Sequence, residues 1–274
     1  MTEVTPPIKV SGVPVDSRAG RRIKAGAGGP AERLGYRMRR LHPLLVSWIV
    51  ANVGAVLLAI VMIGLGFFVT KVLLSSSAVQ DADEWLPKWA EDHRTPFLDD
   101  VSYGASTIAD RPVLIPLIGV AGLILVLYKR WRMASFILQA ALAEVLTYGL
   151  VTKIIKRHRP PVQQLDNFNL NHSFPSGHTA ASVAIYGAIA LLLAAHFKDI
   201  RVRVAIWTIA AAFPLFVASS RIYRGEHHPI DVIAGGLMGA SALVIAVFAA
   251  RTARRVAELR GERHAARRAA EASA

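Results

Sequence analysis

The residues of this 274-residue chain best suited to chemistry lie in three short stretches, 153–160, 174–179 and 220–231. Together these stretches combine arginine, histidine, serine and aspartate side chains. Arg159 in the first stretch and Arg221 in the third carry planar guanidinium groups, which can bind two oxygens of a phosphoryl group at once. The combination predicts a site that binds phosphate.

The second stretch places Ser176 and Gly177 directly before an apolar run that is predicted to be helical. At the start of a helix, free backbone N–H groups and the positive end of the helix dipole favour an anion. Gly177 has no side chain beyond its α-carbon, so the backbone can approach that anion closely. His178 follows as a candidate donor of a proton to a leaving oxygen.

The third stretch contains a potential His–Asp pair. Pro229 suits the first turn of a helix, which places His227 just before that helix and Asp231 within its first turn. Asp231 can then reach one ring nitrogen of His227 and hold the other toward a substrate, as carboxylates do for other catalytic histidines.

Apolar segments of nearly membrane-spanning length separate these stretches, and hydrophobic residues make up 53% of the chain. A helix needs roughly 20 residues to cross the hydrocarbon core, and only helices satisfy their backbone groups within such a segment. The sequence predicts an all-α polytopic membrane protein, a bundle of six transmembrane helices. The predicted spans are 44–69, 113–128, 133–155, 178–197, 204–219 and 230–250; the second and fifth are short, and their ends can extend into flanking residues.

The distribution of charge predicts the orientation. The N-terminal tail, the turns at 129–132 and 198–203 and the C-terminal tail are all basic, which is typical of the cytoplasmic side. The opposite segment, 70–112, is acidic, and Trp85 and Trp89, four residues apart on a predicted helix, indicate that it lies in the outer interface. This topology places all three stretches at the outer membrane face. The basic cluster at 153–159 then lies on the outer side, although lysine and arginine usually gather on the cytoplasmic side. Binding of an anion would account for this exception.

The predicted topology divides the chain into three regions. We expect a disordered basic cytoplasmic tail over 1–43, a membrane domain over 44–250 that includes the external segment 70–112, and a second basic cytoplasmic tail over 251–274. The net charge of +13 lies beside the apolar segments and no nucleic-acid-binding signature accompanies it, so we expect no nucleic-acid partner. The chain has no cysteine, which excludes disulfides and thiolate chemistry.

The three stretches resemble the signature of the type-2 phosphatidate phosphatase family, which shares its site architecture with vanadium haloperoxidases. The family pattern is Lys, six residues, Arg-Pro; then Pro-Ser-Gly-His; then Ser-Arg, five residues, His, three residues, Asp. Residues 175–178 match the second part without change, and Ser220, Arg221, His227 and Asp231 match the third with its spacing intact.

The resemblance implies a lipid phosphatase embedded in the plasma membrane, with a lipid phosphate or diphosphate in the bilayer as substrate and no metal or other cofactor. By similarity, His227 attacks phosphorus and forms a phosphohistidine, Asp231 orients it, and His178 protonates the departing lipid oxygen and later assists water. The residues implied to hold the phosphoryl oxygens are Lys153, Arg159, Ser176, Gly177 and Arg221.

The first stretch departs from the family pattern, because five residues rather than six separate Lys153 from Arg159, and Thr152 stands at the expected spacing. One residue corresponds to roughly 100° around a helix. A long lysine side chain or a distorted helix end can absorb this difference, and Lys156 is an alternative to Lys153.

The sequence leaves the roles of two residues and two alternative functions undecided. His228 is either a headgroup contact or a structural residue, and Glu144, inside the third span, is either functional or a buried structural group. A transporter or scaffold that binds phosphorylated headgroups is an alternative, but it does not explain a His–Asp pair with a second histidine. A vanadate-dependent haloperoxidase is a second alternative, against which the six spans argue. The sequence determines neither the lipid nor the oligomeric state.

Overall fold

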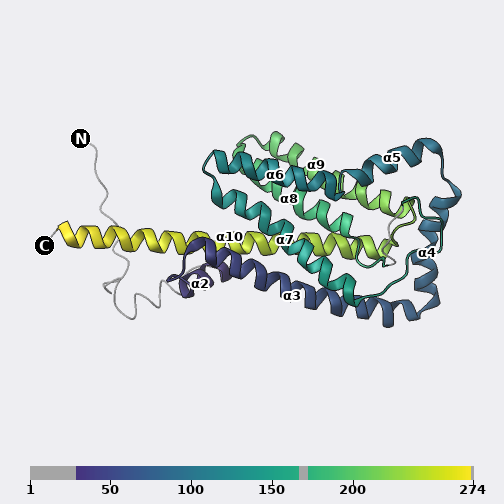
Figure 1. Cartoon of the computed structure of the whole chain (residues 1–274), viewed down its shortest axis with the longest axis horizontal. Coiled ribbons are helices and arrows are strands. Elements are labelled where there is room, and N and C mark those ends of the chain that lie inside the picture. Colours follow the sequence, from purple (N-terminus) through teal and green to yellow (C-terminus); the bar gives the residue numbers. More distant parts are fainter. Residues whose placement is uncertain (1–28, 167–171, 273–274) are drawn as a thin grey trace. The chain divides into compact units, whose positions relative to one another are not determined.

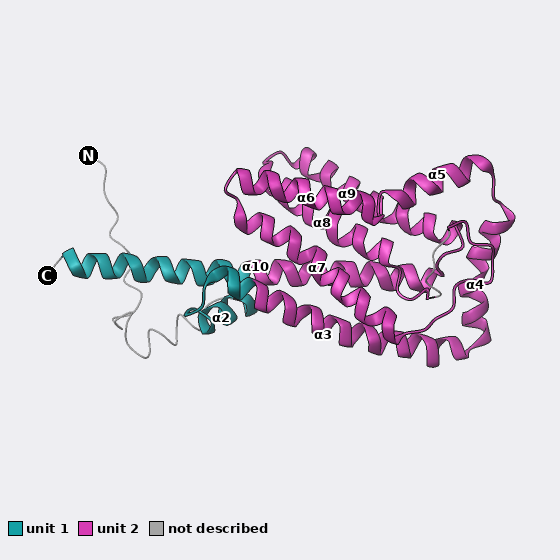
Figure 2. Cartoon of the chain, viewed as in Figure 1, with its two compact units in different colours: residues 1–47, 251–274 teal, residues 48–250 magenta. Residues whose placement is uncertain are grey.

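The computed structural model describes residues 29–166 and 172–272, and every regular element in them is a helix, which confirms the predicted all-α fold. The chain divides into two compact units, one formed by residues 1–47 with 251–274 and the other by residues 48–250 (Figure 2). The helices, labelled in Figure 1, are α2 (Pro30–Arg37), α3 (Pro43–Lys71), η1 (Leu73–Ser75), α4 (Ser77–Asp92), α5 (Pro96–Thr107), α6 (Arg111–Leu127), α7 (Trp131–Ile154), α8 (Gly177–His196), α9 (Ile200–Tyr223) and α10 (Pro229–Ala272).

Six helical segments of the described residues are long and apolar enough to cross a membrane, as predicted. The fifth, Ile200–Tyr223, extends beyond the predicted 204–219 at both ends. The second differs more, because it runs over Pro96–Leu127 and so includes α5, which the sequence pattern placed in the external segment. Apart from Asp99 and Asp100, α5 carries no charged residue, and its apolar and small residues continue the hydrophobic character of α6.

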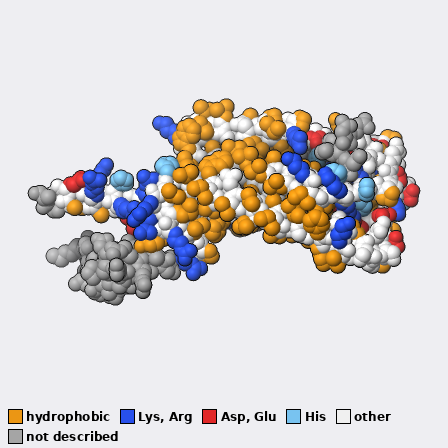
Figure 3. Space-filling view, turned by 60° about the horizontal axis from the view of Figure 1, so that its bottom comes forward, with side chains coloured by type: hydrophobic (Ala, Val, Ile, Leu, Met, Phe, Trp, Pro, Cys, Tyr) orange, Lys and Arg blue, Asp and Glu red, His pale blue; other side chains and the backbone are white. Residues whose placement is uncertain are grey.

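The outer surface of the 48–250 unit is apolar where a bilayer would surround it. Large side chains on different helices are more than half exposed, among them Val61 (65%), Ile115 (65%), Leu215 (68%) and Val244 (65%). Figure 3 shows hydrophobic side chains over the visible flank of this unit, with charged side chains at the end that holds α4. Surfaces of this kind are stable in lipid, because lipid chains do not impose the cost that water imposes on exposed apolar groups.

Two glycines of α10 determine how closely it packs against α8. A Cβ atom on Gly235 would lie 2.3 Å from the carbonyl oxygen of Ser176, and one on Gly239 would lie 2.2 Å from that of Ala180. Neither distance is sterically possible, so the close approach requires glycine at both positions. Small residues at such spacing let transmembrane helices pack backbone to backbone. As a result, the start of α8, with the second stretch, lies beside the start of α10, with the third.

The other unit is also helical where it is described. The expectation of a disordered tail over 1–43 falls mostly on residues 1–28, which lie outside the described residues. The expectation is wrong for Pro30–Arg37, which form α2, because a proline at the helix start, Glu32 in the first turn and Arg37 in the last all favour a helix. In the C-terminal tail, α10 continues to Ala272, supported by ion pairs four residues apart such as Arg254–Glu258.

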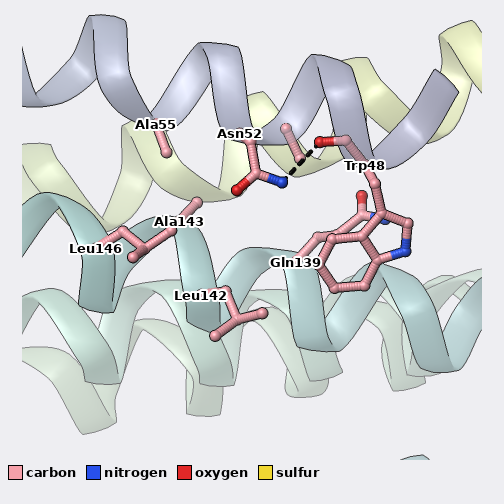
Figure 4. Close-up of a pocket in the computed structure, with 8 residues that line it drawn as sticks. Trp48, Asn52, Ala55, Gln139, Leu142, Ala143 and Leu146 are labelled. Carbon is pink, nitrogen blue, oxygen red and sulfur yellow. Dashed lines mark hydrogen bonds between the residues drawn. The ribbon is translucent and has the colours of Figure 1, made fainter. Parts of the chain in front are cut away.

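A small hollow lies between α3 and α7 in the 48–250 unit (Figure 4). Trp48 and Asn52 line it from α3, and Gln139 and Leu142 line it from α7. The Asn52 amide donates to the carbonyl of Trp48 at 2.8 Å, so this amide has its hydrogen-bond partner within its own helix. None of the predicted site residues lines this hollow, so it is not part of the candidate active site.

Candidate active site

The three stretches come together at one end of the 48–250 unit, where α7 and α9 end and α8 and α10 begin, and α4 runs across this end (Figure 1). The backbone N–H of Ser176 donates to the carbonyl of Asp231 at 3.0 Å, which joins the second stretch to the third. The N–H of Ser173 donates to the carbonyl of Arg157 at 2.9 Å, which joins the first stretch to the segment that leads into the second.

His227 is buried, with 4% of its surface exposed, and its Nδ1 atom lies 2.7 Å from the carbonyl oxygen of Ser173. A carbonyl oxygen only accepts, so this contact assigns the proton to Nδ1 and leaves the lone pair on Nε2. The carboxylate of Asp231 lies 4.0 Å from the same Nδ1 atom, an ion-pair distance beyond hydrogen-bond range. The backbone carbonyl of Ser173, which sequence reasoning missed, therefore holds the ring, and Asp231 acts on it as a nearby negative charge.

The surroundings keep His227 neutral. Burial lowers the pKa of His227 well below its ordinary value, and the positive charges of Arg221 and Arg159 act in the same direction. The negative charge of Asp231 opposes this effect without overcoming it. A neutral imidazole with its lone pair on Nε2 is the form that can attack phosphorus.

A tight turn places Arg221 and His227 in the same site. Gly225 has a φ of 76°, a conformation that side chains disfavour, and a Cβ atom there would lie 2.8 Å from the carbonyl of Gln163. The turn lets the N–H groups of Glu226 and His227 donate to the carbonyl of Arg221, at 3.0 and 3.2 Å. The fixed spacing between Arg221 and His227 in the sequence thus corresponds to a specific turn at the end of α9.

Both predicted phosphate-binding arginines converge on one buried carboxylate. Arg159 forms an ion pair with Glu226 and donates to its backbone carbonyl at 2.9 Å, and Arg221 lies 3.6 Å from the same carboxylate. Burial raises the pKa of Glu226, although the two arginines act against this. Glu226 directly precedes His227, but nothing in the sequence pattern indicated that it would bridge the arginines.

A second carboxylate, Asp166, completes this cluster. It accepts a hydrogen bond from Arg221 at 2.6 Å and two from Arg224, at 2.9 and 2.5 Å. Burial alone would raise the pKa of Asp166, but the hydrogen bonds and positive charges of Arg224 and Arg221 outweigh it and hold the pKa below its usual value. The arginines are thus held by two anionic groups, and a bound phosphoryl group would compete with these groups for them.

The start of α8 presents the second stretch as expected. Ser176 caps the helix by accepting from the N–H of Thr179 at 3.5 Å, and Gly177 is the first helical residue, packed against the ring of Tyr148. A Cβ atom on Gly177 would lie 2.8 Å from that ring, so a larger residue would displace it. His178 Nε2 contacts Asp110 at 2.5 Å, a carboxylate at the start of α6 that sequence reasoning missed and that orients the imidazole.

Asp231 is fully buried and has partners of its own. One oxygen pairs with Arg157, and the other accepts from the N–H of His228 at 2.9 Å and contacts its ring Nδ1 at 3.1 Å. His228 is itself 5% exposed, which favours the structural role left open by the sequence over a headgroup contact. The second guanidinium nitrogen of Arg157 pairs with Asp83 on α4, so Arg157 links two carboxylates.

The structure does not bring the first-stretch lysines into the arginine cluster. Lys153 is exposed near the end of α7, and among the described residues no hydrogen bond or ion pair joins it to the other predicted site residues. Lys156 lies 3.0 Å from His172 Nε2 and donates to the carbonyl of Thr152 at 3.3 Å. Over residues 29–166 and 172–272, no group of three or more His, Asp or Glu side chains could hold a metal ion.

Comparisons with known proteins match the region that contains the three stretches. Residues 132–255, which include all three stretches, match the model of the PAP2 superfamily. The chain is 29% identical over 174 residues to phosphatidylglycerophosphatase B of Bacillus subtilis, covering 63% of this chain and 85% of that protein. It is 31% identical over 122 residues to the undecaprenyl-diphosphatase of Sulfolobus acidocaldarius, covering 42% of this chain and 55% of that protein.

The fold is similar to a solved transmembrane structure of the same superfamily. The crystal structure of a PAP2-type phosphatidylglycerolphosphate phosphatase from Bacillus subtilis aligns with a TM-score of 0.61 and 27% identity, covering 70% of this chain and 93% of that chain. Six candidate spans, the match over residues 132–255 and this likeness agree with the resemblance noted in the sequence. The chain is a multi-pass membrane protein, and its residues 132–255 match the PAP2 superfamily.

Proposed function

We propose that the protein hydrolyses the phosphate or diphosphate of a membrane lipid through a phosphohistidine on His227. The observation that carries this proposal is the state of His227, a buried neutral imidazole whose lone pair is on Nε2, close to two arginines. The names of the relatives, a phosphatidylglycerophosphatase and an undecaprenyl-diphosphatase, support a lipid substrate of the phospholipid or polyprenyl type.

The reaction proceeds in two displacements. Nε2 of His227 attacks phosphorus, the bond from phosphorus to the lipid oxygen breaks, and His178 gives that oxygen a proton. In the second displacement His178 takes a proton from water, whose oxygen attacks phosphorus and breaks the bond to His227, releasing inorganic phosphate. Arg159, Arg221 and the backbone N–H of Gly177 at the start of α8 stabilise the charge on the phosphoryl oxygens, more strongly in the transition state than before it.

We expect lipid phosphates to be turned over far better than water-soluble esters, because the site lies at helix ends where a lipid chain can stay in the bilayer. The test compares phosphate release from phosphatidate, phosphatidylglycerophosphate and undecaprenyl diphosphate with release from glucose 6-phosphate, all with the purified protein in detergent. Equal catalytic efficiency on glucose 6-phosphate and on the lipids would remove the lipid specificity. Binding of the lipids without phosphate release would instead indicate a transporter or scaffold.

We further propose that the site faces the outside of the cell and that both terminal regions, 1–43 and 251–274, are cytoplasmic, with the membrane domain over 44–250 between them. The basic turns at 129–132 and 198–203 and the acidic 70–112 segment support this orientation. Reporter fusions after Lys129 and after Lys198 are expected to read as cytoplasmic, and a fusion within 80–100 as external. The reverse pattern would place the active site on the cytoplasmic side.

A further inference from the structure

The helix α4 contributes one buried carboxylate to the active-site end, although it lies outside all three sequence stretches. Asp83 is 3% exposed, whereas its neighbour Asp81 is exposed. The outward face of α4 carries Trp85 and Trp89, which are 62% and 46% exposed and whose rings stack with centroids 6.4 Å apart. The helix therefore presents aromatic rings outward and Asp83 inward.

Asp83 makes two contacts with the residues that hold the catalytic end of α10. One oxygen accepts from the backbone N–H of Ile230 at 2.9 Å, which satisfies a donor in the first turn of α10. The other oxygen pairs with one guanidinium nitrogen of Arg157, whose second such nitrogen pairs with Asp231. One contact thus holds the residue before Asp231, and the other holds the guanidinium that pairs with Asp231.

Because Asp83, Arg157 and Asp231 are buried together, the position of each charged side chain depends on the other two. Arg157 is 7% exposed and Asp231 is fully buried, so the guanidinium is shared between two carboxylates away from bulk water. Removing the Asp83 carboxylate would leave one guanidinium nitrogen of Arg157 without its partner, so that Asp231 alone would attract the guanidinium. Loss of Asp83 would let Arg157 shift toward Asp231 and change the position and the field of that carboxylate at His227.

We propose that Asp83 is a positioning residue for catalysis, which acts through Arg157 and the first turn of α10 to hold Asp231 in place beside His227. This inference rests on the proposed function, because it assigns Asp83 a role in the reaction of His227. It also connects the reaction to α4, a helix whose exposed tryptophans suit the membrane interface.

The test is a double-mutant comparison on the full-length protein, with the lipid phosphate that the wild type hydrolyses best among the three lipids named above. Asp83→Asn removes the charge but keeps an oxygen that can accept from Ile230, and we expect it to lower kcat by about tenfold or more with KM nearly unchanged. Asp231→Asn alone is expected to cost about a hundredfold or more. In the Asp231→Asn background, adding Asp83→Asn is expected to cost less than about twofold, because the residue through which Asp83 acts is already lost.

The matched control is Asp81→Asn, which removes the same charge from an exposed position of the same helix and is expected to leave kcat unchanged. If Asp83→Asn does not fold, Asp83→Glu, which keeps the charge and moves it by one methylene, is expected to lower kcat with KM unchanged. The proposal is overturned if kcat of the folded Asp83 variant equals that of the wild type, or if its loss multiplies in full with that of Asp231→Asn. An inactive wild type would instead contradict the proposed function.

Discussion

Replacing His227 with alanine is expected to abolish both phosphate release and the labelled phosphoenzyme. His227 is buried close to the arginine cluster, and its hydrogen bond to the carbonyl of Ser173 leaves the lone pair on Nε2 that can attack phosphorus. The measurement uses a lipid substrate labelled in its phosphate, with the enzyme quenched in alkali and separately in acid, since a phosphohistidine survives alkali and is lost in acid. His158→Ala is the control, because His158 is an exposed histidine of the first stretch.

The acidity of His227 adds a second readout. Because burial lowers the pKa of His227 well below its ordinary value, the ring stays neutral when the pH falls through the value of a free imidazole. Phosphoenzyme formation in single-turnover experiments is therefore expected to persist at pH 6 and below, and to fail only when His227 is protonated. Full activity in the His227→Ala protein, or a phosphoenzyme that withstands acid, would show that another group attacks phosphorus.

Replacing Arg221 with alanine is expected to lower kcat/KM by about a hundredfold or more, the effect of losing one donor to the charge of a transition state. Arg159→Ala is expected to have a similar effect, because both arginines contact the same buried carboxylate. Lys153→Ala is expected to cost only a few-fold, since Lys153 is exposed and no described hydrogen bond or ion pair joins it to this cluster. The measurements are kcat/KM with a lipid phosphate and the inhibition constant of vanadate, which resembles the transition state.

Two controls separate loss of phosphate binding from loss of structure. Arg221→Lys keeps the positive charge near Asp166 and loses only the bidentate hydrogen bonding of the guanidinium. The variant is therefore expected to fold and still bind vanadate weakly. Lys156→Ala is compared with Lys153→Ala, because Lys156 was the alternative in the first stretch. A larger loss with Lys156→Ala would reverse the assignment within that stretch, and a loss with Lys153→Ala equal to that of Arg221→Ala would place Lys153 in the phosphate site.

The membrane architecture was determined by the sequence alone, because hydrocarbon thickness sets the length of an apolar helix whatever its neighbours are. The same holds for local geometry within one short segment. The spacing from Arg221 to His227 corresponds to a single turn at Gly225, and Pro229 predicted the start of α10. The limits of the second span and the helix α2 were missed, because a hydropathy pattern does not detect amphipathic or short helices well.

The partners of the site residues were decided by the tertiary structure. Asp83 lies 74 residues from Arg157, Asp110 lies 68 from His178, and Asp166 lies 55 from Arg221 in the sequence, so no local spacing links them. Their contacts depend on how helices and loops from distant parts of the chain meet in the folded protein. The sequence indicated which residues we propose for the reaction, and only the packing of the helices decided which carboxylates and which carbonyl hold them in place.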